Sequence, residues 1–318
     1  MSGKVSLLIS GASGFVGKQL LNQLTKFEAY TFNCAVRAEN SNVPFPVVIR
    51  SIDTNTNWSS ALEGKQVVLH MAGRAHIMRD DSTDPLTEYR KVNVAGTLNL
   101  ARQAAASGVK RFIFISSVKV NGEATAPATL FKHDDEPQPQ DFYGVSKAEA
   151  EAGLKQLAAE TGMEIVIIRP PLVYGPGVKA NFATMLKWAQ KNLPLPFGAI
   201  HNRRSMVALD NLVDLIITCI SHPNAANQTF LVSDDQDIST TELLQMMTRA
   251  AGKKPRLLPV PVSWLKLAGK LTGKQAVIDR LSGNLQVDIE HTKNTLSWSP
   301  PVSVEEGIKR CFTKEDLC

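Results

Sequence analysis

The sequence predicts an α/β fold in which helices cover both faces of a doubly wound parallel sheet, followed by a smaller, mostly helical C-terminal part. In the first half, short apolar runs rich in β-branched residues alternate with longer helical patterns. Strands that are apolar throughout and separated by helices are typical of a parallel sheet buried on both faces. After Arg169 the pattern changes to Pro- and Gly-rich links between short helices, which indicates a separate region.

The alternation of patterns sets the expected elements and domains. We expect the dinucleotide-binding domain at residues 1–175, together with residues 207–233, which return to it. We expect a second domain at residues 176–206 and 234–318, at the carboxyl edge of the sheet. We expect strands at Val5–Ser10, Tyr30–Val36, Val47–Ile52, Val67–Met71, Phe112–Ser116, Glu164–Arg169 and Thr229–Ser233. We expect helices at Gly14–Lys26, Tyr89–Ser107, Tyr143–Thr161, Asn181–Lys191 and Val207–Ser221.

Composition narrows the class of protein. The chain has 318 residues, is 43% hydrophobic and carries a net charge of +5, which fits a globular protein that binds a polyanionic small molecule. Its Lys and Arg residues form no basic run, so we expect no nucleic-acid partner. The four cysteines show neither CxxC nor zinc spacing, which indicates no metal site and a reducing, cytoplasmic location. No signal peptide and no membrane-spanning stretch is expected.

A glycine motif follows the first predicted strand and opens a helix. The first glycine, Gly11, permits a tight turn, Gly14 lets the backbone approach a pyrophosphate, and Gly17 lets the helix pack closely on the strand. The free N–H groups of the helix N-terminus then face the phosphates. The motif predicts a Rossmann-type dinucleotide site lined by Gly11, Ser13, Gly14, Phe15, Val16 and Gly17.

The end of the second predicted strand bears on the choice of nicotinamide cofactor. An acidic residue there would bind the ribose 2′-hydroxyl of NAD, but this chain has Arg37. A planar guanidinium can instead hold two oxygens of a 2′-phosphate. The sequence therefore favours NADP(H), with NAD(H) as the alternative and an ordinary surface role for Arg37 also open.

Tyr143 and Lys147 are spaced four residues apart in a predicted helix, so they share one face. A free tyrosine has a pKa of about 10 and exchanges protons poorly near neutrality. We expect the neighbouring ammonium and the positive nicotinamide to lower this pKa, so that Tyr143 acts as general acid or base in hydride transfer. Ser116 and Ser117 end the fifth predicted strand, where a hydroxyl can bind the substrate oxygen.

The GxxGxxG and YxxxK spacings together resemble the extended branch of the short-chain dehydrogenase/reductase superfamily. The resemblance implies that Ser117 is the catalytic hydroxyl beside Tyr143 and Lys147. It also implies that Asp53 lies near the adenine. The other residues that it assigns to the cofactor site are Met71, Ala72, Gly73, Asn93, Ser116, Lys147 and Pro170.

The second half resembles the NAD-dependent epimerase/dehydratase family, similar to UDP-galactose 4-epimerase. The resemblance rests on RPPLVYGPG (Arg169–Gly177), Ala180-Asn181-Phe182, Arg203-Arg204 and SWSPPVSVEEGIKR (Ser297–Arg310). It implies a nucleotide-diphosphate sugar as substrate and a homodimer formed through the helices at Tyr89–Ser107 and Tyr143–Thr161. Asn181 would contact the nucleotide, and Arg204 and Arg280 the diphosphate.

The segment SSVKVNGE (Ser116–Glu123) departs from the common patterns of that family. It lacks the Asp-Glu pair of the dehydratases, and Lys119, which we expect to contact substrate, replaces a small or hydroxyl residue. The segment resembles 4-keto reductases that make UDP-N-acetylquinovosamine for surface polysaccharide. We therefore expect NADPH-dependent reduction of a UDP-4-keto-deoxysugar. The alternative is a UDP-sugar 4-epimerase with tightly bound NAD. A dinucleotide-sensing regulator is a third hypothesis, which the intact Ser117, Tyr143 and Lys147 disfavour.

Overall fold

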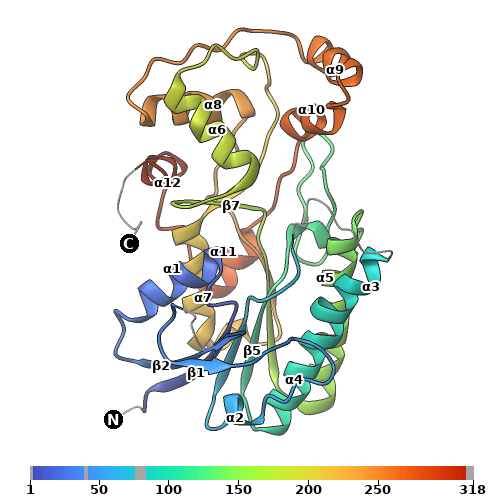
Figure 1. The fold of residues 1–318 in the computed structure, drawn as a ribbon, viewed down its shortest axis with the longest axis vertical. Coiled ribbons are helices and arrows are strands. Elements are labelled where there is room, and N and C mark those ends of the chain that lie inside the picture. The colour runs from blue at the N-terminus through green and yellow to red at the C-terminus, as the bar shows by residue number, and fades with distance from the viewer. Residues whose placement is uncertain (1–2, 39–41, 76–83, 313–318) are drawn as a thin grey trace.

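The computed structural model describes residues 3–38, 42–75 and 84–312, and its centre is a parallel sheet of seven strands (Figure 1). The strand order is β3-β2-β1-β4-β5-β6-β9, so the chain reverses direction across the sheet between β1 and β4. This point of reversal is where doubly wound sheets bind ligands, outside the carboxyl ends of the strands. The strands are β1 (Val5–Ser10), β2 (Tyr30–Val36), β3 (Pro46–Val48), β4 (Val67–His70), β5 (Arg111–Ile115), β6 (Glu164–Arg169) and β9 (Thr229–Leu231).

Helices cover both faces of the sheet because its strands are apolar on both sides. Each face has its own buried cluster, one around Leu20 and Ile216 and the other around Leu100 and Leu154. The first face packs against α1 (Phe15–Leu24), α7 (Leu209–Ser221) and α11 (Glu290–Leu296). The second packs against α2 (Ser59–Leu62), α4 (Thr97–Ala106) and α5 (Phe142–Thr161) (Figure 1).

The C-terminal part is mostly helical and lies beyond the carboxyl ends of the strands (Figure 1). A separate apolar cluster holds it together, with Phe182, Leu244, Met247 and Ile308 buried between helices. Two short strands, β7 (Leu172–Tyr174) and β8 (Met206–Ala208), pair in parallel beneath it. Its helices are α6 (Ala180–Lys191), α8 (Thr240–Ala250), α9 (Val262–Leu271), α10 (Gln275–Ser282) and α12 (Val304–Arg310).

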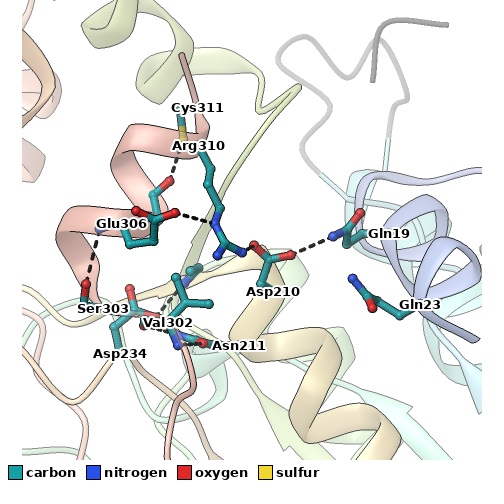
Figure 2. Close-up of polar contacts among 12 residues, drawn as sticks. Gln19, Gln23, Asp210, Asn211, Asp234, Val302, Ser303, Glu306, Arg310 and Cys311 are labelled. Atoms are coloured by element: carbon teal, nitrogen blue, oxygen red, sulfur yellow. Dashed lines mark hydrogen bonds and ion pairs between the residues drawn. The ribbon is translucent and has the colours of Figure 1, made fainter. Parts of the chain in front are cut away.

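Polar contacts join this part to the helices of the sheet (Figure 2). Asp210, at the start of α7, accepts from Gln19 of α1 at 2.6 Å and from Arg310 of α12 at 2.7 Å. Its neighbour Asn211 donates to the carboxylate of Asp234 at 2.6 Å and accepts from the backbone of Val302 at 2.8 Å. The first turn of α7 therefore fixes α12 relative to α1.

Several predicted elements differ from those observed. The third strand is shorter than Val47–Ile52, because only Pro46–Val48 pairs with β2. The helix predicted at Tyr89–Ser107 is three segments: α3 (Pro85–Tyr89), a π-helical segment (Arg90–Gly96) and α4. The predicted helix Val207–Ser221 begins only at Leu209, because the residues before it form β8.

Candidate functional site

The glycine loop has the geometry that a dinucleotide needs. Gly11 has φ +80°, and a Cβ added there would lie 2.6 Å from the backbone nitrogen of Ala72. A Cβ at Gly17 would lie 2.3 Å from the carbonyl oxygen of Gly11. Gly14, the N-cap of α1, supplies no side-chain hydrogen bond, so the first N–H groups of the helix, at Phe15 and Val16, keep their donors for a ligand. The loop therefore fits a pyrophosphate.

The end of β4 brings this loop to the catalytic helix. Ser10 and His70 are partners across β1 and β4, and their side chains lie 2.6 Å apart beneath the loop. Further along, a Cβ at Gly73 would lie 3.6 Å from Lys147 Nζ and 3.0 Å from Asn93 Oδ1. Any larger residue at Gly73 would therefore fill the space between the glycine loop and Lys147.

Asn93 lies in the π-helical segment and holds the chain that follows β4. Its Oδ1 accepts from the backbone of Arg74 at 2.7 Å, and its Nδ2 donates to the hydroxyl of Ser146 at 2.9 Å. Asn93 is buried, so these bonds are shielded from water. Its polar groups join β4 to α5, and this is the place where the resemblance expected a cofactor residue.

Tyr143 and Lys147 are in the first turns of α5, which begins because Asp141 caps it by accepting from Gly144 at 2.6 Å. Lys147 is buried, donates to the carbonyl of Ile115 at 2.8 Å, and places its ammonium 5.9 Å from the centre of the Tyr143 ring. The hydrogen bond to Ile115 therefore places the pair beside the carboxyl end of β5.

Burial dominates the electrostatics of the pair. It lowers the pKa of Lys147 to about 8, although the carboxylate of Glu151 acts in the opposite direction. It also raises the pKa of Tyr143, and the charge of Asp141 adds to this rise. In the protein without its cofactor, desolvation of the phenolate raises the pKa of Tyr143. The lowering of this pKa by the ammonium together with the positive nicotinamide stays a prediction for the loaded site.

The two serines after β5 have different environments. Ser117 is half-buried, and its hydroxyl accepts from the backbone of Lys119 at 3.2 Å, so its proton is free to face a substrate. Ser116 is buried and donates to Glu151 at 2.5 Å. The hydroxyl of Ser116 is thus engaged below the edge of the sheet. This difference favours Ser117 as the hydroxyl that acts on substrate.

A buried ion pair below the edge was missed by the sequence analysis. Glu151 and Arg169 are 3% and 2% exposed and form an ion pair at 2.6 Å. Arg169 also donates to Asn121 at 3.0 Å. The pair holds Ser116 and therefore the end of β5. Two signals could have found it: Glu151 follows Lys147 by four residues on one helical face, and Arg169 directly follows four apolar residues in its strand.

Lys119 forms ion pairs with two carboxylates. Its ammonium contacts Asp141, the cap of α5, and lies 3.2 Å from Glu123. It therefore links the turn that carries Ser117 to the start of the helix that carries Tyr143. The ammonium of Lys119, which we expected to contact substrate, is therefore neutralised by carboxylates of the protein itself.

Arg37 and Asp53, the residues expected around the adenosine, lie apart from this cluster, whereas Pro170 adjoins it. Arg37 follows β2 and is exposed, and the described residues provide it with no hydrogen bond or ion pair. The carboxylate of Asp53 accepts from Asn55 at 2.9 Å and from Thr56 at 3.1 Å. Asp53 therefore shapes the loop before α2. Pro170 continues β6, and its carbonyl accepts from Val118 at 3.0 Å, beside Ser117.

The structure brings together two of the three residues expected at the nucleotide diphosphate. Arg204 donates to the carbonyl of Arg280 at 3.0 Å and to that of Gly283 at 3.2 Å, and burial lowers its pKa. Asn181 is exposed on the first turn of α6. All three belong to the C-terminal part, beyond the carboxyl edge that carries Ser117.

Comparisons with known proteins identify the family of the chain. A family model described as the NAD-dependent epimerase/dehydratase family matches residues 7–233. The chain is 52% identical over 307 residues to a UDP-glucose 4-epimerase of Vibrio cholerae, with 96% of this chain and 94% of that protein covered.

Two crystal structures share the fold at 21% identity, with 96% of this chain and 97% of theirs covered. One is UDP-glucuronic acid 4-epimerase from Bacillus cereus in complex with NAD, with a TM-score of 0.75. The other is UDP-glucose 4-epimerase with UDP-glucose from Thermotoga maritima, with a TM-score of 0.74. At this identity they support the fold alone.

The Vibrio cholerae relative overturns the prediction of a 4-keto-sugar reductase. That prediction relied on one short segment around Lys119 and on Arg37, whereas the similarity to a 4-epimerase extends over almost the whole chain. The structure explains why the segment misled: the charge of Lys119 is taken up by Asp141 and Glu123. A lysine at this position therefore says little about the reaction.

Proposed function

The chain belongs to the NAD-dependent epimerase/dehydratase family, and from this membership we propose that it inverts C4 of a UDP-hexose as a UDP-glucose 4-epimerase. The observation that carries the proposal is the carboxyl edge of the sheet. There Ser117, Tyr143 and Lys147 stand beside a glycine loop that fits a dinucleotide. The substrate class comes from the Vibrio cholerae relative.

Tyr143 moves the proton in this reaction. It takes the proton from the C4 hydroxyl and returns it to the C4 oxygen after inversion. A nicotinamide held by the glycine loop and Lys147 would supply the reversible hydride transfer at C4. Because each step is reversed by the second half, the reaction has no net oxidant or reductant.

The other residues of the site assist this proton transfer. Burial raises the pKa of Tyr143, so the phenolate must be favoured by positive charge in the loaded site, and the ammonium of Lys147 lies 5.9 Å from the ring. Lys147 would also hold the nicotinamide ribose. The hydroxyl of Ser117 would donate to the C4 oxygen and keep it in reach of Tyr143.

The C-terminal part would hold the nucleotide, and the Rossmann half the cofactor. We assign the diphosphate to Arg204 and Arg280, which lie together, and the nucleotide to Asn181. In this division, residues 176–206 and 234–318 form the substrate domain. A homodimer through α4 and α5 and a cytoplasmic location, where the free thiols of Cys34, Cys219 and Cys311 would persist, complete the proposal.

We propose NAD as the resident cofactor. The preference for NADP rested on Arg37 and on the need of a reductase for a consumable reductant, and the second reason is lost with the reductase. Epimerisation regenerates its cofactor in each turnover, so a retained NAD suffices. Arg37 is exposed, so it can contact the adenosine without specifying a phosphate.

The test is epimerisation by the purified protein with no added nicotinamide. Incubation with UDP-glucose is expected to give UDP-galactose, resolved by anion-exchange chromatography, and the nucleotide released on denaturation should have the mass of NAD. Tyr143→Phe is the control, because it should retain the nucleotide and form product more slowly by about 100-fold or more. Absence of UDP-galactose from protein that contains NAD would contradict the proposal.

A further inference from the structure

Helix α9 presents an apolar face that the rest of the described chain does not cover. Trp264, Leu267 and Leu271 are 71%, 61% and 80% exposed. Their spacing of three and four residues places them on one side of the helix. Leu265 and Gly269 form the opposite, buried stripe, where a Cβ at Gly269 would lie 2.9 Å from Ile278 of α10. The packing of α9 therefore does not account for its exposed apolar residues.

The sequence that contains this helix is rich in basic residues. Between Glu242 and Asp279 the sequence contains no acidic residue. Lys266 and Lys270 lie one turn apart beside the apolar face, and the ammonium of Lys266 lies 3.8 Å from Asp279. The basic residues between Glu242 and Asp279, all exposed, are Arg249, Lys253, Lys254, Arg256, Lys266, Lys270 and Lys274.

Apolar residues flanked by lysines match the chemistry of an anionic bilayer surface. Tryptophan and leucine enter the boundary between headgroups and acyl chains, while lysine stems extend to lipid phosphates. Interfaces between protein chains are instead depleted of lysine around their apolar centres. The charge around α9 thus favours lipid over a second copy of this chain.

We propose that α9 and the basic residues around it dock the protein on a membrane surface that contains anionic lipids. The helix has 10 residues and is about 15 Å long, half of the roughly 30 Å of a bilayer core, so it lies in the plane of the interface. Among the described residues no helix is long and apolar enough to cross a membrane. The attachment is therefore peripheral.

The docking surface adjoins the substrate side of the molecule. α9 packs on α10, and α10 carries Arg280, whose carbonyl accepts from Arg204. In Figure 1 both helices lie at the end of the molecule far from the chain N-terminus and from β1 and β2. Docking would hold the C-terminal part against the membrane and leave the Rossmann half in the aqueous phase. The proposal uses only surface residues and does not depend on the proposed reaction.

The experiment is flotation of the full chain with vesicles at low ionic strength. Vesicles of phosphatidylcholine with about 30% phosphatidylglycerol should bind the protein, and pure phosphatidylcholine should bind it far less. The double variant Leu267→Glu/Leu271→Glu should lose binding at least tenfold. Lys270→Gln/Lys274→Gln should lose about 25-fold, because each basic residue near an anionic surface contributes roughly fivefold.

A matched control lies at the opposite end of the molecule. Lys26→Gln/Phe27→Glu removes one exposed basic and one exposed apolar residue after α1, and it should bind vesicles as the wild type does. All variants should turn over UDP-glucose at the wild-type rate, so loss of docking is separable from failure of the proposed function. In the wild type, the emission of Trp264 should shift to the blue on binding.

Three results would overturn the proposal. One is absence of flotation with anionic vesicles. Another is equal loss of binding in the control and in the α9 variants. The third is a concentration-dependent dimer that Leu267→Glu/Leu271→Glu dissociates, in protein that binds no vesicles, because a second copy would then cover the apolar face.

Discussion

The substitution Lys147→Met is expected to raise the free energy of unfolding near neutral pH while it abolishes activity. Lys147 is 3% exposed, and its ammonium lies 4.3 Å from the centre of the Phe114 ring. Such burial penalises the charged form. Methionine has a similar length and no charge, so it removes this penalty and keeps most of the packing.

The magnitude follows from the pKa of Lys147, which burial lowers from 10.5 to about 8. Each pKa unit corresponds to about 1.36 kcal/mol, so the charged lysine costs the folded state about 3 kcal/mol. The cost is complete below the folded pKa, where both states carry the charge. It fades as pH rises, because the folded lysine loses its proton first and the unfolded chain then binds more protons.

Urea unfolding at two pH values measures this cost. The stability difference between Lys147→Met and the wild type should fall by roughly 2–3 kcal/mol from about pH 7 to about pH 10. Comparison of the two proteins cancels the titration of all groups that do not interact with Lys147. The control is Lys155→Met, which lies exposed on the same helix and should give a difference that does not change with pH.

A stability difference that stays constant over this pH range would refute the reasoning, because it would mean that the folded Lys147 keeps an ordinary lysine pKa. A lower free energy of unfolding in Lys147→Met than in the wild type at neutral pH would also contradict the prediction. The hydrogen bond to the Ile115 carbonyl would then contribute more than the charge costs.

Three further substitutions test other parts of the site. Tyr143→Phe should lower kcat by about 100-fold or more with cofactor binding retained, and turnover at the wild-type rate would remove Tyr143 from the reaction. Glu151→Gln leaves the guanidinium of Arg169 buried without its carboxylate and should cost about 3–5 kcal/mol in urea unfolding; a cost below about 1 kcal/mol would deny the pair a structural role. Arg37→Ala should weaken the binding of NAD and NADP to a similar extent in fluorescence titrations, because Arg37 is exposed and contacts the adenosine without specifying a phosphate; a loss of about tenfold or more confined to NADP would show that Arg37 binds a 2′-phosphate.

Local pattern accounts for most of the sheet. β1, β2 and β6 begin and end where the sequence predicts, because their apolar runs are bounded by polar and turn residues. The π-helical segment was not predicted, since the bonds of Asn93 to Arg74 and Ser146 come from segments distant in the sequence. The pairing of β7 with β8 was not predicted either, because a strand of three residues is too short to show an alternation of apolar and polar side chains.

The candidate site also contains features that local sequence predicts and features that depend on tertiary packing. Short spacings predicted the glycine loop and the pair Tyr143 and Lys147, because each motif lies within one turn or one helix. The ion pair of Glu151 with Arg169 depends on how α5 packs against β6, which no local pattern reveals. The reaction was predicted wrongly because the catalytic groups are common to reductases and epimerases, and only the rest of the chain separates them.

The fate of the hydrogen on C4 tests the central claim most directly. UDP-glucose carrying deuterium at C4 is incubated in ordinary water with the purified protein and no added nicotinamide, and the UDP-galactose formed is analysed by mass spectrometry and NMR. The account predicts that the product keeps the deuterium at C4, because the hydride leaves and returns without exchanging with water. Product without deuterium at C4, or no product from protein that contains NAD, would contradict it.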